Sequence, residues 1–280
     1  MTFVDAHVHF WDRARLPYPW LDEFPAIAGP HTPDNLRREA PDAFPAHIVF
    51  VQAVGDGARW LDELRWIESL AAAEPRIAAI VAYAPMDAGD VTTTTLAELA
   101  RHPLVRGVRD LIQGRDAGVC TSAAFVAGVQ QLPPLRLSFD LCCKHHQLPA
   151  VIELVRRCPH TNFILDHAGK PDIRAGRLEP WREHIRELAQ HLNVTCKISG
   201  LITEADPNHW EPAQLQPYVE HLLATFGPGR LLFGSDWPVV KLGATYGRWL
   251  ETVRAWLAPL PEPQVQAILH DNARRVYRLD

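Results

Sequence analysis

Two histidines separated by one residue, His7 and His9, lie in the apolar run VDAHVHF near the start of this 280-residue chain. Side chains alternate between the faces of a β-strand, so in a strand the two imidazoles should share one face with Phe3 and Asp5. Imidazole nitrogens arranged in this way can converge on one zinc ion. Two core histidines would give the same HxH pattern, so the rest of the chain is needed to distinguish metal ligands from core residues.

Other ionisable residues stand at the ends of later apolar runs. His167 follows NFILD, Asp236 ends RLLFGSD, Lys197 lies near the end of VTCKISG, and Arg109 lies near the end of VRGVRDL. Buried ionisable groups must be paired or bound to a metal. Their repeated occurrence at equivalent strand ends therefore predicts a converging site in which His7 is one member.

Each of these residues also has a structural alternative. Arg109 could form an ion pair with Asp110 or Asp140, and Lys197 could be a surface lysine at a strand end. The residue types alone leave both alternatives open.

Two carboxylates near the histidines are expected to support them. Asp166 precedes His167, so simple alternation turns it away from His167, where it faces the helix layer or orients a neighbour. Asp5 precedes His7 by two residues and is expected to accept hydrogen bonds that orient the histidines.

The elements that must position these residues follow an alternating pattern. Short β-rich apolar runs recur at 3–10, 47–54, 76–83, 105–111, 136–143, 162–168, 194–200 and 230–236, and helical periodicity appears at 60–74, 91–102, 148–158 and 217–226. Buried parallel strands alternating with helices are typical of α/β proteins. Eight runs in a chain of this length predict one distorted (β/α)8 TIM barrel domain spanning 1–280. A doubly wound open sheet is the alternative, but no glycine-rich phosphate turn follows an early strand.

The first connection, residues 11–46, is unusually long and rich in proline and aromatic residues. In a barrel it would leave the C-terminal end of the first strand, where we expect a lid-like loop over the site. Trp20 in this loop and Trp237 after the last strand could stack on a substrate ring or simply pack the loop. His145, in KHHQL, could contact substrate or lie on the surface. The C-terminal residues 261–279 are expected to form a closing pair of helices.

Composition limits the partners. The chain is 47% hydrophobic and 22% charged, with a formal net charge of −5 and a sequence pI of about 6.3. This charge balance argues against a nucleic-acid or acidic-membrane partner. The odd number of cysteines without a CxxC spacing, and a beginning that lacks a targeting segment, favour reduced thiols in the cytoplasm. A homo-oligomer is compatible with the sequence.

Five motifs resemble the amidohydrolase superfamily and, within it, the L-rhamnono- and L-fucono-lactonase-like branch, which is related to 2-pyrone-4,6-dicarboxylate lactonase. These motifs are DAHVHFW, RGVR, LDHAGKP, CKISGLITEAD and FGSDWPV. The resemblance implies a (β/α)8 barrel that hydrolyses a small lactone, in particular a sugar-acid lactone. It also implies one divalent metal ion, zinc, at His7, His9, His167 and Asp236, although the related pyrone lactonase works without a metal.

The resemblance further implies roles for individual residues. Asp236 is expected to be the general base that activates water, with His167 beside it. Arg109 and Lys197 match positions that face the substrate. Asp110 departs from the histidine found after the matching arginine in fucono-lactonase-like proteins, and the KHHQL loop also differs, so the lactone is left open. The alternative functions are metal-free hydrolysis of a lactone from aromatic catabolism, decarboxylation of a small unsaturated acid, or a non-catalytic barrel that binds a sugar acid.

Overall fold

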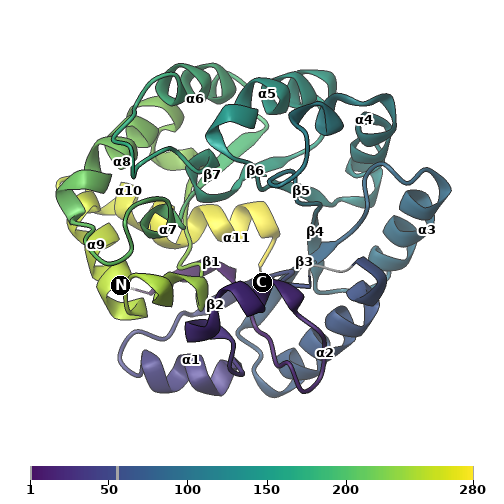
Figure 1. Ribbon diagram of the computed structural model, residues 1–280, viewed down its shortest axis with the longest axis horizontal. Coiled ribbons are helices and arrows are strands. Elements are labelled where there is room, and N and C mark those ends of the chain that lie inside the picture. The colour runs from purple at the N-terminus through teal and green to yellow at the C-terminus, as the bar shows by residue number, and fades with distance from the viewer. Residues whose placement is uncertain (1, 55–56, 280) are drawn as a thin grey trace.

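A computed structural model describes residues 2–54 and 57–279, and within them parallel strands form one sheet in which β1 to β8 follow each other in order. Figure 1 looks along the resulting ring, with most of the helices around its outside. The strands are β1 (Val4–Val8), β2 (His47–Val51), β3 (Ile77–Tyr83), β4 (Val105–Arg109), β5 (Ser138–Leu141), β6 (Phe163–Leu165), β7 (Val194–Ile198) and β8 (Leu231–Phe233). Each lies inside one of the predicted runs, so the predicted (β/α)8 barrel is confirmed.

The ring closes through the residues that follow β8. Val8 forms a parallel bridge with Trp237, and the His9 amide donates a hydrogen bond to the Trp237 carbonyl (2.7 Å). The Asp236 amide donates to the carbonyl of His7 (2.9 Å). Backbone hydrogen bonds therefore fix the predicted metal ligands of the first and last strands next to each other.

The helices lie mainly between consecutive strands. They are α1 (Pro33–Glu39), α2 (Trp60–Ala73), α3 (Asp90–Leu99), α4 (Ala123–Val129), α5 (Leu148–Arg157), α6 (Trp181–Ala189), α7 (Leu201–Glu204), α8 (Pro212–Phe226), α9 (Tyr246–Leu257), α10 (Glu262–Gln266) and α11 (Asn272–Tyr277). Helical periodicity identified α2, α3, α5 and α8. It did not identify α4, α6 and α9.

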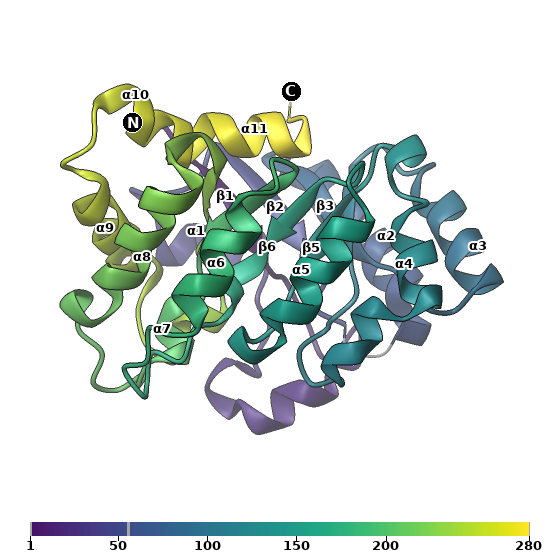
Figure 2. The same cartoon turned by 90° about the horizontal axis from the view of Figure 1, so that it is seen from above.

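The C-terminal segment forms one helical run, whereas a pair of separate helices was expected. A π-helical turn at Ala267–Asp271 joins α10 to α11 without a break. In Figure 1, α11 crosses the middle of the ring, and Figure 2 places it at the end of the barrel opposite the N-terminal connection. Side chains of α11 pack with inward-facing strand residues in one buried cluster: Val4, Ala6, Val49, Val51, Ala79, Val81, Ile164, Leu232, Ala273, Tyr277 and Leu279. This helix therefore closes the N-terminal end of the barrel.

The long connection at 11–46 contains more regular structure than a plain loop. Two 3₁₀ turns, Pro19–Glu23 and Pro25–Ile27, precede α1. Reciprocal backbone hydrogen bonds between Trp11 and His31 hold its two limbs together. Figure 2 shows this purple segment at the end of the barrel away from α11, which is the end that carries the site described below.

Two sequence expectations about the environment can be compared with the structure. All five cysteines are free and buried. Among the described residues, no helix combines the length and apolarity needed to cross a membrane.

Candidate active site

His7, His9 and Asp236 bring three ligand atoms together at the C-terminal ends of β1 and β8. The Nε2 atoms of His7 and His9 are 3.2 Å apart, and Asp236 Oδ1 lies 3.3 Å from His9 Nε2 and 3.7 Å from His7 Nε2. All three side chains are buried. This triangle is one of two groups of possible metal ligands among the residues that the structure describes.

The two histidines share a face, as residues i and i+2 of a strand do, but it is not the face that alternation from Phe3 and Asp5 predicts. The pairing of β1 with β2 shifts register between Asp5 and Val8. Val4 and Ala6 belong to the barrel-interior cluster, whereas Phe3 packs against Phe233. The expectation that Phe3 and Asp5 share the face of the histidines is therefore wrong, because the irregularity turns His7 inward after Ala6.

The triangle fits a zinc ion. At zinc–nitrogen distances of about 2.0–2.1 Å, tetrahedral ligand atoms lie roughly 3.3–3.4 Å apart, which is close to the observed separations. The Nδ1 atom of His9 lies 2.7 Å from the Val51 carbonyl, an oxygen that can only accept a hydrogen bond. His9 Nδ1 must therefore carry the proton, and its Nε2 lone pair is free to bind a metal.

Asp236 is held ionised and in a constrained backbone conformation. Burial alone would raise its pKa, but the neighbouring His167, His9 and His7 more than offset this and the pKa falls below the usual range for a carboxyl group. Its φ of +59° lies in the left-handed region, which is rarely adopted outside glycine. Such strain is found where the surroundings fix a functional side chain.

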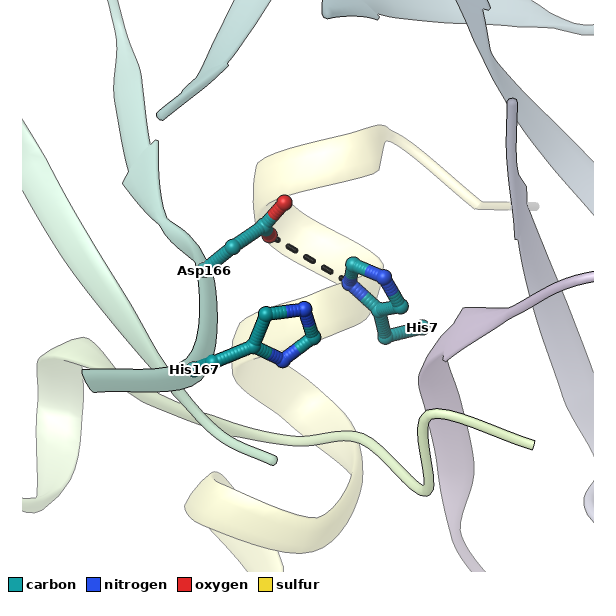
Figure 3. A group of neighbouring side chains, drawn as sticks. All are labelled: His7, Asp166 and His167. Carbon is teal, nitrogen blue, oxygen red and sulfur yellow. Dashed lines mark ion pairs between the residues drawn. The ribbon is translucent and has the colours of Figure 1, made fainter. Parts of the chain in front are cut away.

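His167 approaches the same space from the end of β6. Its φ is +53°, its Nδ1 lies 2.9 Å from Ser199 Oγ, and its Nε2 is 4.0 Å from Asp236 Oδ1. Burial lowers its pKa to about 4, so the ring is neutral at pH 7. Figure 3 shows His167 and Asp166, consecutive in the chain, both pointing toward His7, and these three residues form a second group of possible ligands. His167 thus lies beside the triangle and not in it.

Asp166 does not face the helix layer, which was one of its two predicted positions, but its contacts with His7 and Lys197 agree with the alternative that it orients a neighbour. The strand β6 ends at Leu165, and the left-handed conformation of His167 places both side chains inside the barrel. Asp166 Oδ1 lies 3.3 Å from His7 Nδ1 and 2.9 Å from Lys197 Nζ. Burial opposes its ionisation, but Lys197 and His7 bring its pKa well below the usual range.

Lys197 is fully buried beneath His7. Its Nζ lies 2.5 Å from Asp140 Oδ2 and 3.2 Å from His7 Nδ1. Burial alone would lower its pKa, yet Asp140 and Asp166 raise it, so the ammonium stays charged. The surface-lysine alternative is therefore wrong.

Arg109 is also buried and contacts His7. Its NH1 lies 3.1 Å from Asp166 Oδ2 and 3.4 Å from His7 Nε2, and its NH2 donates to the Gln52 carbonyl (2.6 Å). Its carboxylate partner is Asp166, whereas Asp110 and Asp140 had been considered.

Asp110 contacts residues that follow β3 and β4. It accepts a hydrogen bond from the Met86 amide (3.0 Å) and pairs with Arg115 (3.3 Å). The departure from the resembled motif at this position therefore changes a loop contact beside the barrel.

Asp5 ties the ends of β1 and β8 together, as a supporting carboxylate should. Its Oδ1 accepts from the amides of His7 (3.2 Å) and Ser235 (2.8 Å), and its Oδ2 accepts from the Tyr246 hydroxyl (3.0 Å).

Two of the residues predicted to bind substrate are partly exposed. Trp20 lies in the first 3₁₀ turn, donates through Nε1 to the Ala53 carbonyl (2.9 Å), and packs edge-on against Trp11. His145, after β5, lies 3.1 Å through Nδ1 from the carbonyl of Lys170. Neither is among the possible metal ligands.

Trp237 has no exposed surface. Its ring packs against Phe10 and His31, and its Nε1 donates to Glu39 of α1 (2.8 Å). In this structure it anchors the 11–46 segment and offers no face to a substrate.

Gly200 gives His167 the space it occupies. A Cβ at Gly200 would lie 2.5 Å from His167 Nδ1, and the φ of Gly200 is +62°. Gly176 has a similar φ of +65° with nothing within 4 Å of its Cβ position, so it is a matched control.

Gly200→Ala is expected to lower kcat on the order of tenfold to 100-fold, because the methyl group displaces His167. Gly176→Ala should share only the backbone cost of about 1 kcal/mol and keep full kcat. Steady-state kinetics and thermal unfolding of both variants test this. Equal kcat values for the two variants would show that the position of His167 does not matter.

Residues 4–279 of the chain match the amidohydrolase family. The chain belongs to this family. An L-fucono-1,5-lactonase of Burkholderia ambifaria is 33% identical to this amidohydrolase over 287 positions, which cover all of this chain and 97% of that protein. An L-fucono-1,5-lactonase of Burkholderia multivorans is 33% identical over 99% of this chain and 96% of its own length. The crystal structure of a Burkholderia multivorans amidohydrolase with bound zinc superposes with a TM-score of 0.91 at 32% identity, and all of both chains is covered.

Proposed function

We propose that this amidohydrolase opens the ring of a sugar-acid lactone by hydrolysis. The observation that carries the proposal is the buried triangle of His7, His9 and Asp236 at the end of the barrel where such enzymes react. Full-length similarity to two L-fucono-1,5-lactonases supports the lactone class, and L-fucono-1,5-lactone is the first substrate to test.

We further propose that His7, His9 and Asp236 hold one zinc ion, with His167 beside it. The ligand spacing and the protonation of His9 at Nδ1 support this assignment. For His7 to bind through Nε2, its Nδ1 must donate to Asp166, which lies within reach. Bound zinc would polarise the lactone carbonyl and lower the pKa of a water molecule to about 7.

The residues of the chain carry the proton. Asp236 begins ionised and accepts a proton as water adds to the lactone carbonyl carbon. The ring carbon–oxygen bond then breaks, and Asp236 returns this proton to the leaving ring oxygen. A carboxyl group with a low pKa is a weak base, so it holds the proton only briefly. The product acid is ionised at pH 7, so each turnover releases one proton to the solvent.

His167 is neutral and close to Asp236, where it can orient the water or donate to the carbonyl oxygen. Lys197 and Arg109 act on the site through His7 and Asp166, because both cations are already paired with buried carboxylates. Trp20 and His145 are the partly exposed candidates for contact with the sugar.

A pH-indicator screen against sugar-acid lactones and lactones from aromatic catabolism tests the function. Proton release well above spontaneous hydrolysis, without carbon dioxide, is expected with at least one sugar-acid lactone. Carbon dioxide from an unsaturated acid would support decarboxylation and contradict the proposal. Binding that stabilises the protein without turnover would indicate a non-catalytic barrel.

A further inference from the structure

An unbroken series of buried polar contacts runs from the C-terminal helix to the candidate metal site. The Tyr277 hydroxyl donates to Asp140 Oδ2 (2.8 Å), and the same oxygen lies 2.5 Å from Lys197 Nζ. Lys197 Nζ is 2.9 Å from Asp166 Oδ1, which is 3.3 Å from His7 Nδ1. The series therefore joins the residue that ends α11 to a candidate zinc ligand.

No member of this series is exposed to solvent. Water cannot replace a lost contact there without entering the barrel core, so each donor has a fixed set of acceptors. Gly107 helps to make the room, because a Cβ at this position would lie 2.3 Å from Ser138 Oγ and 3.6 Å from Asp140 Oδ1. The geometry of one contact consequently depends on the others.

The Tyr277 hydroxyl affects how strongly Lys197 interacts with each of its two carboxylate partners, Asp140 and Asp166. Lys197 is attracted by two carboxylates, Asp140 and Asp166, and the Tyr277 hydroxyl partly satisfies Asp140. Without that hydroxyl, Asp140 would draw the ammonium more strongly and leave Asp166 less well neutralised. Asp166 is the group that must accept a hydrogen bond from His7 Nδ1 if His7 Nε2 is to bind a metal.

We propose that Tyr277 is a positioning residue for His7, which acts through Asp140, Lys197 and Asp166. The C-terminal helix would then set the orientation of the site as well as close the barrel. Two features favour this role over a packing role. The packing of Tyr277 in the apolar interior cluster is made by its ring and does not require the hydroxyl. In addition, buried ion pairs such as those of the series are not in general a source of net stability. The inference rests on the proposed function and on its zinc ligands.

Tyr277→Phe is the test, because it removes the hydroxyl and keeps the ring. Tyr218→Phe is the matched control, since Tyr218 is also buried but its hydroxyl donates to the Arg177 carbonyl (3.4 Å), outside the series. The measurements are kcat and KM on a lactone that the wild type turns over, and zinc affinity of the apoprotein by chelator competition.

Tyr277→Phe is expected to lower kcat and zinc affinity about threefold to tenfold, with KM unchanged. This is less than the effect of losing a direct partner of a ligand, because the hydroxyl is further removed. In an Asp140→Asn background, Tyr277→Phe should add less than about a twofold change, since coupled residues are not additive. If Asp140→Asn does not fold, the comparison with Tyr218→Phe decides.

Equal behaviour of Tyr277→Phe and Tyr218→Phe, with an active wild type, would overturn this inference alone. If the wild type is active without zinc, the kcat values of Tyr277→Phe and Tyr218→Phe alone decide whether Tyr277 positions His7. A wild type that neither binds zinc nor hydrolyses a lactone would overturn the proposed function as well.

Discussion

Asp236→Asn is expected to lower kcat about 100-fold or more, because asparagine cannot accept the proton of the attacking water. Asparagine keeps the size of the side chain and one oxygen that can still bind a metal. Asp236 is ionised among three imidazoles, so the variant removes a charge that these rings stabilise. Steady-state kinetics on an active lactone, together with the zinc content of the purified variant, measure the effect.

Zinc content separates the two roles of Asp236. Loss of kcat with zinc retained would show the proton-transfer role, whereas loss of both would show that the carboxylate is needed to hold the metal. Asp271→Asn is the control, since Asp271 is largely exposed and pairs with His270 in the C-terminal helical run. Wild-type turnover by Asp236→Asn would contradict the assignment of the base.

Removal of zinc by exhaustive chelation is expected to lower kcat at least about 100-fold, and zinc added back in equal amount should restore it. The reason is that neutral imidazoles and a paired arginine offer less charge to a developing oxyanion than a divalent ion. Elemental analysis must accompany the assay at each step.

His9→Gln is the matched variant for this experiment. It removes the imidazole whose Nε2 lone pair faces the site and should weaken zinc binding by 10-fold or more, on the order expected for a disturbed ligand set. Full activity in protein shown to be free of metal would establish the metal-free alternative. His7 and His167 would then act on the lactone without an ion.

The parts of the fold that could be predicted were those that depend on patterns of neighbouring residues in the sequence. All strands from β1 to β8 lie in the predicted runs, because strands buried on both faces require continuous apolar residues. Equivalent strand ends meet at one end of a barrel, so His7, His9, His167 and Asp236 could be expected to converge.

Alternation failed where the backbone leaves regular strand geometry. The register shift between Asp5 and Val8 and the left-handed conformation of His167 each interrupt the alternation of faces. Simple alternation placed Asp166 opposite His167, although both side chains point toward His7. The sequence DHAG at the end of β6 could have been interpreted as an irregular turn, because it ends in a glycine and contains a candidate ligand.

Contacts between residues far apart in the chain could not be predicted from the sequence. Lys197 and Asp140 are 57 positions apart, and Tyr277 meets Asp140 from the far end of the chain. No local pattern encodes which buried cation pairs with which carboxylate, because the barrel diameter and strand register set those pairs. The resemblance implied that Lys197 faces the substrate, and the structure adds that its Nζ lies 3.2 Å from His7 Nδ1.

The most direct test of the central claim is proton release by zinc-loaded wild-type protein from a pure sugar-acid 1,5-lactone, run beside Asp236→Asn and a no-enzyme control. We expect the wild type to release one proton for each lactone consumed, well above the spontaneous rate, and the variant to stay near that rate. No rate enhancement by the zinc-loaded wild type on any sugar-acid lactone would contradict the account.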